Sequence, residues 1–381
     1  MATENNNKNL NVPNLRFPEF SGEWEKELLG TTCNVLMCKR ILASQTNAEC
    51  GVPFYKIGTI GGIPDAYISK VLFESYRAKY NYPRKGEVMI TCAGTVGKAM
   101  IFDGEDSYYQ DSNIVWIDNP TNKIDNTFLY HFISKVDWSK LNTTTIVRIY
   151  NDDLRQLRIS YPTLSEQRKI SIFLNLLNQR IETQKKIIED LKKLKDAISV
   201  RLFTSATCVK RELSDLATIV MGQSPSSQCY NTDNEGLPLI QGNLDITKGK
   251  LTPRIYSSEM TKKCHTGDVI LTVRAPVGEV AIADFDACIG RGVCAIRPFN
   301  STYSVLIYQF LQHYKPKWIS LEQGSTFTSV SRNDIMSIKI GIPSIQAIEI
   351  LNILDDKISI EDVILNNLNS QKNYLLTQLF I

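Results

Sequence analysis

The sequence predicts an α+β protein in which two strand-rich modules are separated by two long antiparallel helices of the coiled-coil type. An internal repeat of roughly 180 residues predicts the two modules, and two long segments without Gly or Pro predict the helices. The 381 residues are enough for two or three domains with cores of their own. The expected parts are a disordered tail at 1–14, a first module at 15–162, a central helix at 163–204, a second module at 205–343 and a C-terminal helix at 344–381.

The repeat is visible as short motifs that recur 181 positions apart. The matched motifs are Gly86-Glu87-Val88 with Gly267-Asp268-Val269, Val96-Gly97 with Val277-Gly278, Asp152-Asp153-Leu154 with Asn333-Asp334-Ile335, and Tyr161-Pro162 with Ile342-Pro343. A period this long exceeds that of a solenoid and indicates duplication of a whole module.

Both halves show the same order of elements. Each has a strand, a glycine turn and a second strand, then a helical patch, then a strand that ends at proline. These segments are 88–102, 127–141 and 155–162 in the first half, and 269–283, 304–319 and 336–343 in the second. Gly97 and Gly278 are interpreted as turn glycines rather than ligand contacts.

Apolar residues recur at spacings of three, four and seven in both long segments. They are Ile170, Leu174, Leu177, Ile181, Ile188, Leu191, Ile198 and Leu202 in the first, and Leu351, Leu354, Ile358, Leu365, Leu368, Leu375 and Leu379 in the second. Each helix is roughly 55–60 Å long at 1.5 Å per residue, longer than one small module covers. The two helices can therefore bury these apolar residues against each other. Because each helix follows its module in the same way, a pseudo-two-fold arrangement would make the helices antiparallel. The alternative is that each helix packs only on its own module.

Composition narrows the class of protein. No apolar run reaches the ~20 residues that a membrane helix needs, and the first residues do not form a signal peptide. Nine single cysteines without a CxxC pair favour a reducing cytoplasm. Three histidines leave little material for a zinc site or a histidine-based triad, so we expect no metal site. The net charge of +3 is compatible with nucleic-acid binding but does not predict it.

The sequence contains fragments of two catalytic or nucleotide-binding motifs, and in each case the rest of the motif is missing. Asp118-Asn119-Pro120 continues with Thr121, whereas an amino-methyltransferase motif needs a second proline and an aromatic residue. Gly97-Lys98 and Gly249-Lys250 lack the glycine five positions earlier that a phosphate-binding loop requires. We therefore expect no catalytic residues and no cofactor in this chain.

An ordered set of local patterns resembles the specificity subunit of type I restriction-modification systems. The patterns are Leu15-Arg16-Phe17-Pro18-Glu19-Phe20, Leu213-Ser214-Asp215-Leu216-Ala217, Gln323-Gly324-Ser325-Thr326-Phe327 before Ser331-Arg332, and Pro162 followed by Glu166-Gln167 and Ile170. The second copy departs from the last pattern, because Gln346-Ala347-Ile348 replaces the Glu-Gln pair. The first copy has Asn142-Thr143-Thr144-Thr145 where the loop glycine belongs.

The resemblance implies a division of labour between subunits. Each module would be a target-recognition domain that reads one half of a split site in double-stranded DNA. The helices would hold the domains apart and bind two adenine-methyltransferase subunits, which use S-adenosylmethionine. ATP-dependent restriction subunits, which use ATP and Mg²⁺, are optional further partners. Because 31–82 and 217–264 differ in sequence, we expect two different half-sites about one helical turn, on the order of 10 base pairs, apart.

Candidate DNA contacts are side chains that pair with bases or phosphates and that lie in predicted loops or strand ends. They are Lys56, Lys98, Arg148, Tyr150 and Asn151 in the first module, and Gln223, Gln241, Asn243, Arg274, Arg291, Ser325, Thr326 and Arg332 in the second. For each of them the alternative is a solvated surface residue. Two alternatives stand for the whole chain: a methyltransferase or nuclease with fused recognition domains, or a coiled-coil adaptor without a DNA role.

Overall fold

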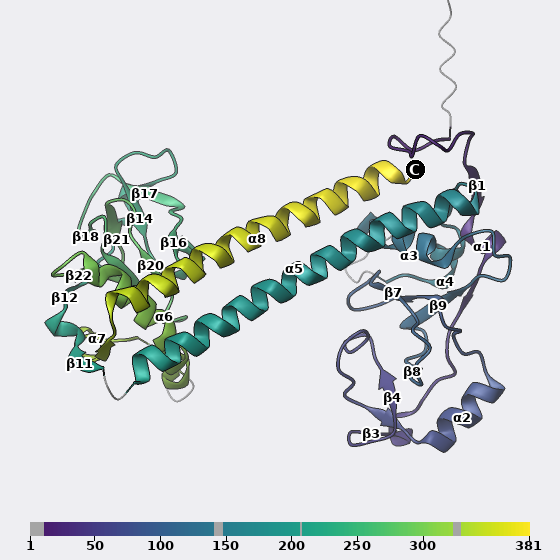
Figure 1. Cartoon of the computed structure of the whole chain (residues 1–381), viewed down its shortest axis with the longest axis horizontal. Helices are drawn as coiled ribbons and strands as arrows, with labels where there is room; N and C mark the ends of the chain where they lie inside the picture. The colour runs from purple at the N-terminus through teal and green to yellow at the C-terminus, as the bar shows by residue number, and fades with distance from the viewer. Residues whose placement is uncertain (1–10, 141–147, 206–207, 323–328) are drawn as a thin grey trace, which may run out of the picture. The chain divides into compact units, whose positions relative to one another are not determined.

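The computed structural model describes residues 11–140, 148–205, 208–322 and 329–381. The chain forms two compact units, one made of Met1–Thr183 with Ile364–Ile381 and one made of Gln184–Val363. The division falls inside both long helices, α5 (Leu164–Thr204) and α8 (Ile345–Leu379). Each unit therefore contains one strand-rich module and one half of each long helix (Figure 1). We call residues 15–162 module 1 and residues 205–343 module 2.

Module 1 is built on an antiparallel sheet of order β2-β9-β6-β7. Its strands are β2 (Asn34–Leu36), β9 (Ile114–Asp118), β6 (Val88–Thr91) and β7 (Ala99–Ile101). Alternate side chains of the central strands enter two cores: Ile90 and Ile117 on one face, Met89 and Trp116 on the other. Central strands buried on both faces read as continuous apolar runs, as Val88–Ile90 does before Thr91.

Further elements cover the two faces of this sheet. The core of Ile90 is closed by α3 (Asn126–Lys135), by β1 (Glu25–Leu28) paired with β10 (Arg158–Tyr161), and by the start of α5. The core of Met89 is closed by a second sheet of order β3-β5-β4-β8 and by α2. The remaining bounds are β3 (Thr46–Asn47), β4 (Val52–Tyr55), β5 (Tyr67–Ile68), β8 (Tyr108–Tyr109), α1 (Leu29–Thr32), α2 (Lys70–Lys79), α4 (Asn151–Arg155), and the 3-10 turns η1 (Ala43–Gln45) and η2 (Trp138–Lys140).

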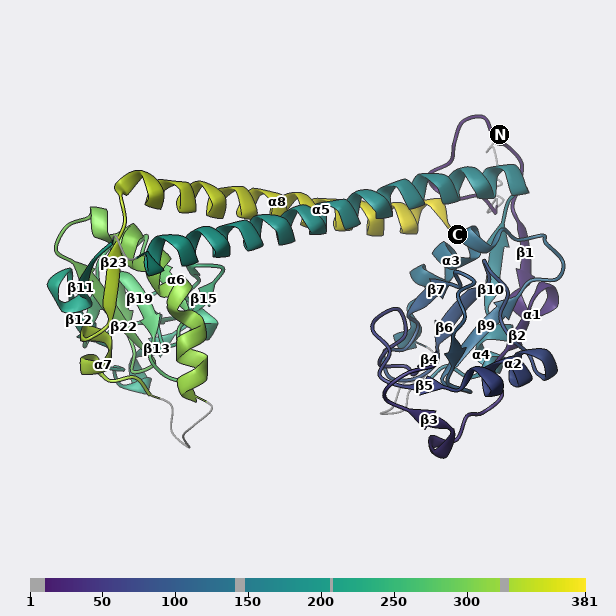
Figure 2. The ribbon, with the colours of Figure 1, turned by 60° about the horizontal axis from the view of Figure 1, so that its bottom comes forward.

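Module 2 repeats this plan, as the labels in Figure 2 allow the reader to follow. Its central sheet has the order β12-β22-β19-β20, which matches β2-β9-β6-β7, and its second sheet has the order β13-β17-β14-β21-β18. The bounds are β11 (Val209–Glu212), β12 (Ala217–Met221), β13 (Tyr230–Asn231), β14 (Leu237–Ile240), β15 (Ile246–Thr247), β16 (Lys250–Leu251), β17 (Ile255–Ser257), β18 (Lys263–Cys264), β19 (Val269–Thr272), β20 (Val280–Ile282), β21 (Ala287–Ile289), β22 (Val293–Pro298), β23 (Lys339–Ile342), α6 (Thr302–Glu322), α7 (Arg332–Met336), η3 (Leu213–Asp215), η4 (Ser227–Cys229) and η5 (Asn243–Asp245). The matching strand orders confirm the duplicated fold.

The glycine turns at 88–102 and 269–283 have the same construction. The hydroxyl of Thr91 accepts the amide of Lys98 at 3.0 Å, and the hydroxyl of Thr272 accepts the amide of Glu279 at 2.9 Å. In both turns, the threonine at the end of the first strand thus accepts a hydrogen bond from the residue that follows the glycine.

Gly97 and Gly278 are turn glycines, as the sequence predicts. Their φ angles are +81° and +95°, a region that other residues avoid. A Cβ at Gly97 would lie 2.0 Å from Cδ1 of Trp138, and one at Gly278 would lie 2.7 Å from Cδ1 of Trp318. Both the backbone angle and the tryptophan contact require glycine at these positions.

The long helices pair antiparallel within each unit. In the first unit, Ile170 near the start of α5 shares a core with Leu379 at the end of α8. In the second unit, Nε2 of Gln184 donates to Oε2 of Glu361 at 2.5 Å, and Nζ of Lys195 lies 2.5 Å from Oδ1 of Asp355. Residues further along α5 thus contact residues nearer the start of α8, which is the pattern of antiparallel helices. The alternative in which each helix packs only on its own module is wrong.

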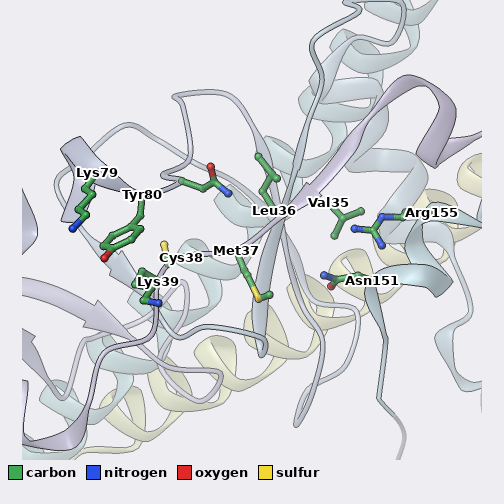
Figure 3. A pocket seen from close by; sticks show the side chains of 10 residues that line it. Val35, Leu36, Met37, Cys38, Lys39, Lys79, Tyr80, Asn151 and Arg155 are labelled. Atoms are coloured by element: carbon green, nitrogen blue, oxygen red, sulfur yellow. The ribbon is translucent and has the colours of Figure 1, made fainter.

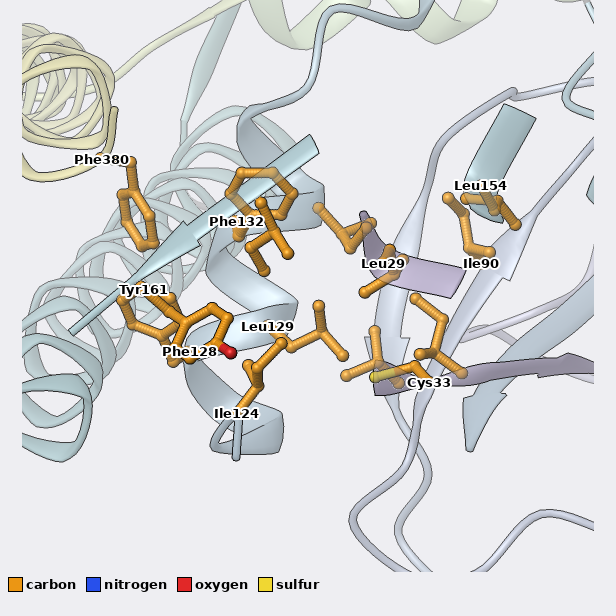
Figure 4. Packing of buried hydrophobic residues seen from close by; sticks show 14 of the residues in the cluster. Leu29, Cys33, Ile90, Ile124, Phe128, Leu129, Phe132, Leu154, Tyr161 and Phe380 are labelled. Carbon is orange, nitrogen blue, oxygen red and sulfur yellow. The ribbon is translucent and has the colours of Figure 1, made fainter. Parts of the chain in front are cut away.

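The two ends of the described chain lie together in the first unit. Asn11 donates through Nδ2 to the carbonyl of Trp24 at 2.6 Å and accepts the Trp24 amide at 2.8 Å, so residues 11–14 belong to the fold and not to a disordered tail. The amide of Leu15 donates to the carbonyl of Gln378 at 3.0 Å. The ring of Phe380 packs on Phe128 at a centroid distance of 4.9 Å (Figure 4).

None of the helices in the described ranges has an apolar segment long enough to cross a membrane.

Candidate nucleic-acid interface

A short loop, Gly290-Arg291-Gly292, joins β21 to β22 in module 2 and is held by the backbone around it; we call it the 290 loop. Its hydrogen bonds are Gly290 N to Ile240 O at 2.8 Å, Arg291 N to Ser224 Oγ at 3.2 Å and Val273 N to Gly292 O at 2.9 Å. The residue just before the loop, Ile289, accepts the amide of Gln223 at 2.9 Å. The loop therefore has a defined backbone conformation, and its one side chain, Arg291, is exposed.

Gln241 packs against the 290 loop. A Cβ at Gly290 would lie 3.4 Å from Cγ of Gln241, and one at Gly292 would lie 2.0 Å from its carbonyl oxygen. The backbone of Gln241 is fixed by the buried carboxylate of Asp245, which accepts the Gln241 amide at 2.8 Å. Oδ1 of Asp245 accepts Nε of Arg254 at 2.9 Å, so this charge is paired.

Other predicted residues of module 2 lie around the same loop. Arg274 follows Val273 directly, is exposed, and forms an isolated backbone bridge with Ser329. Asn243 is half-buried at the start of η5, two residues after Gln241. The structure thus brings Gln223, Gln241, Asn243, Arg274 and Arg291 to one place.

Arg332, also predicted, is exposed as the first residue of α7, after the N-cap residue Ser331. Val330 links this segment to the strand before Arg274, because its amide donates to the carbonyl of Val273 at 3.0 Å. The predicted Ser325 and Thr326 lie outside the described residues.

Module 1 has different side chains at the corresponding place. Because β4 pairs with β8 as β14 pairs with β21, Tyr55 corresponds to Ile240 and Lys56 to Gln241. Nζ of Lys56 lies 3.0 Å from Oδ1 of Asp65, and Nζ of Lys98 donates to the carbonyl of Ile60 at 2.7 Å. Both predicted lysines are therefore engaged with the loop 56–65.

A basic groove of about 460 Å³ lies elsewhere in module 1 (Figure 3). Its lining residues are Val35, Leu36, Met37, Cys38, Lys39, Lys79, Tyr80, Asn81, Asn151 and Arg155. Nζ of Lys39 and Nζ of Lys79 lie 5.4 and 5.6 Å from the centre of the Tyr80 ring. Burial raises the pKa of the Cys38 thiol to about 12, so the thiol stays neutral and the charge of the groove comes from its basic side chains.

A second depression, of about 320 Å³, continues this groove because both are lined by Met37, Asn151 and Arg155. It also contains Arg148 and Tyr150, whose side chains lie 5.8 Å apart from guanidinium carbon to ring centre. The predicted Arg148, Tyr150 and Asn151 therefore share one surface.

The sequence-based candidates did not include five other residues of this groove: Lys39, Lys79, Tyr80, Asn81 and Arg155. A signal was present in residues 77–85, where basic residues alternate with tyrosines in the sequence RAKYNYPRK. Basic side chains interleaved with aromatic ones are typical of nucleic-acid surfaces.

Two modules with one strand order, each followed by a long helix, define a duplicated recognition protein whose modules differ at their surfaces. The chain belongs to the family described as type I restriction modification DNA specificity domain, and the family model matches it twice, at residues 21–193 and 206–370. This membership assigns DNA sequence specificity to both halves of the chain.

Two curated relatives carry names from the same family. A putative type I restriction enzyme specificity subunit of Haemophilus influenzae is 53% identical over 142 residues, which cover 37% of this chain and 37% of the relative. The putative MjaX specificity subunit of Methanocaldococcus jannaschii is 27% identical over 374 residues, which cover 89% of this chain and 87% of the relative. The first similarity is thus confined to about a third of each protein, whereas the second spans both modules.

Solved structures share the fold. The S subunit of the type I restriction-modification system of M. genitalium matches with a TM-score of 0.64 at 18% identity, over 97% of this chain and 99% of that one. A chain from a structure of complex assembly and conformational transition in the type I R-M system matches with a TM-score of 0.60 at 22% identity, over 94% and 97%.

Proposed function

We propose that this chain is the non-catalytic specificity subunit of a type I restriction-modification complex. Module 1 and module 2 each read one half of a bipartite, asymmetric site in double-stranded DNA. The long helices set the distance between the half-sites, on the order of 10 base pairs. The proposal is supported by family membership together with one structural observation: the same frame carries two different candidate reading surfaces.

The difference between the surfaces supports an asymmetric target. In module 2 the candidate surface is the 290 loop with Gln241, whereas in module 1 it is the groove of Lys39, Lys79 and Tyr80. The helix α2, which supplies Lys79, precedes β6, whereas the short strand β18 precedes the matching strand β19. Different side chains on different elements read different bases, so the two half-sites differ.

The long helices support a duplicated partner. Leu164 and Ile172 of α5 are 38% and 61% exposed, and the residues 181 positions later, Ile345 and Ile353 of α8, are 66% and 65% exposed. Exposed apolar side chains that recur at equivalent positions fit two copies of one partner subunit. We propose that these are the adenine-methyltransferase subunits.

The chemistry belongs to the partners in this proposal. The methyltransferase subunits bind S-adenosylmethionine, and an optional restriction subunit binds ATP and Mg²⁺. Such a complex works in the cytoplasm, where genomic DNA and these small molecules are present.

Co-expression of the chain with a candidate methyltransferase, followed by mapping of modified adenines in genomic DNA, tests the proposal. We expect one split motif with unequal halves, and no methyl transfer when the purified chain alone meets labelled S-adenosylmethionine and DNA. A single uninterrupted motif, a palindromic split motif, or methyl transfer by the chain alone contradicts the proposal.

A charge-reversal pair tests the module 1 groove within the same complex. Lys39→Glu with Lys79→Glu should lower DNA affinity at least tenfold, since phosphate contacts and their released counterions are lost. The matched control is Lys186→Glu with Lys192→Glu, which makes the same charge change on the exposed face of α5. Equal losses in both double variants would show a net-charge effect and not a DNA-binding groove.

A further inference from the structure

The 290 loop and Gln241 form a constellation with a base-reading chemistry of its own. We propose that Arg291 reads a guanine and Gln241 reads an adenine at neighbouring positions of the half-site bound by module 2. This inference rests on the proposed function and deepens it, because it names the residues and the bases of one half-site.

The shape of the loop favours insertion into the major groove of DNA. Arg291 is flanked by Gly290 and Gly292, so one side chain projects from three residues. Gly292 has no room for a Cβ, which would lie 2.0 Å from the Gln241 carbonyl oxygen. Gly222 is also close to the loop, because a Cβ there would lie 2.1 Å from the Gly290 carbonyl oxygen. These close backbone contacts hold the loop, so the backbone at Arg291 has a fixed position.

The charge of Arg291 is available for a ligand. Two other arginines of module 2 form ion pairs: Arg254 with Asp245 at 2.9 Å and Arg297 with Asp268 at 2.9 Å. Among the residues that the structure describes, no ion pair includes Arg291 or Arg274. Asp245, the nearby buried acid, accepts from Arg254 and from the amide of Gln241.

The chemistry of the two side chains matches two bases. An arginine guanidinium donates two parallel hydrogen bonds to O6 and N7 of guanine, and a glutamine amide pairs with N6 and N7 of adenine. The Gln241 Cγ lies beside Gly290, and Arg291 is the next residue, about 3.8 Å further along the backbone. Gln241 and Arg291 therefore start from adjacent places on the surface, which suits contacts to neighbouring bases ~3.4 Å apart along the duplex.

Module 1 lacks this pair at the corresponding place. Lys56 stands where module 2 has Gln241, and it is paired with Asp65. β8 of module 1 is equivalent to β21 of module 2, and Tyr109 corresponds to Ile289. Two residues further on, Asp111 therefore corresponds to Arg291, so module 1 has a negative charge where module 2 has a positive one. A guanine–adenine step read by an arginine–glutamine pair at this place is therefore expected for module 2 alone.

Selection from a randomised DNA library by the full chain in complex with its methyltransferase tests the inference. Arg291→Gln should lower discrimination for guanine at one position roughly 5- to 160-fold, the range for a lost bidentate pair, and shift the preference there towards adenine. Gln241→Ala should relax a neighbouring adenine position by a similar factor. The matched control Arg211→Gln, on the exposed strand β11, should leave every base preference unchanged.

The outcomes separate this inference from the proposed function. If Arg291→Gln weakens binding equally for all sequences, Arg291 contacts phosphate and the inference is overturned while the function stands. If the preferences change only in the half-site of module 1, the assignment is also overturned. If the wild-type complex selects no sequence, the proposed function itself fails. Circular dichroism of each variant checks that a lost preference does not come from unfolding.

Discussion

Gln167 is expected to be a main stabilising residue of module 1, although it is polar. Its side chain is fully buried and makes three hydrogen bonds: Oε1 accepts the amide of Asp125 at 2.6 Å, and Nε2 donates to the carbonyls of Lys123 at 3.0 Å and Pro162 at 2.8 Å. These bonds join the start of α5 to the N-cap of α3 and the end of β10. Each is worth about 1 kcal/mol net, so Gln167→Ala should reduce the free energy of unfolding by about 3 kcal/mol.

Urea and thermal unfolding followed by tryptophan fluorescence measure this effect. Three of the four tryptophans, Trp24, Trp116 and Trp138, lie in module 1, so the signal reports mainly on that module. For a unit of this size the loss corresponds to a decrease in Tm of roughly 6–12 °C. The matched control Gln179→Ala, on the exposed face of α5, should change stability by less than about 0.5 kcal/mol. Equal shifts for the two variants would refute the reasoning.

Three further predictions concern the glycine turns, the partner surface and pH. Gly97→Ala and Gly278→Ala should each cost about 2–5 kcal/mol in urea unfolding, from positive φ and from overpacking against tryptophan. Ile172→Asp and Ile353→Asp should each reduce the methyltransferase copies bound from two to one in native mass spectrometry. Burial lowers the pKa of His131 to about 4. As the pH falls, this histidine is therefore protonated in the unfolded chain before it is protonated in the folded chain. Stability should therefore drop by about 3 kcal/mol between pH 6.5 and 4, and His131→Gln should remove that part of the pH dependence.

Each of these predictions has an outcome that contradicts it. Wild-type stability of either alanine variant would show that the turn accommodates a Cβ. Val363→Asp is the control for the partner surface, since Val363 is exposed but its counterpart 181 positions earlier is Glu182. Loss of a bound subunit in that variant too would point to general helix damage. An unchanged pH slope in His131→Gln would mean that other groups cause the acid sensitivity.

Local patterns predicted most of the fold. The spacing of Ile170, Leu174 and Ile181 predicted one long helix because a helical stripe depends on neighbouring residues alone. The same face of the helix also carries a polar residue, Gln184, which is buried and hydrogen-bonded to Glu361. Reading the sequence could not find this pair, since the two partners are 177 positions apart and a glutamine alone reads as solvated.

The predicted DNA contacts stay predictions, and the structure shows which of them lie together on one surface. Gln241 and Arg291 were predicted from their side-chain type and from their position in predicted loops or at strand ends. Lys39 and Tyr80 come together only through the path of β2 beside the end of α2, a tertiary arrangement without a counterpart in module 2. Lys56 was chosen for its loop position, but its ion pair with Asp65 depends on how that loop closes.

The docking of Phe380 has a consequence for biosynthesis. Leu376, Leu379 and Phe380 belong to the core of module 1. Phe380 contacts Phe128, and Lys135 donates to the Phe380 carbonyl at 3.0 Å. Module 1 is synthesised before these residues, so its core is complete only after residues 376–380 have left the ribosome. A stop codon or a proteolytic cut before residue 376 should therefore destabilise module 1, the half of the protein that is made first.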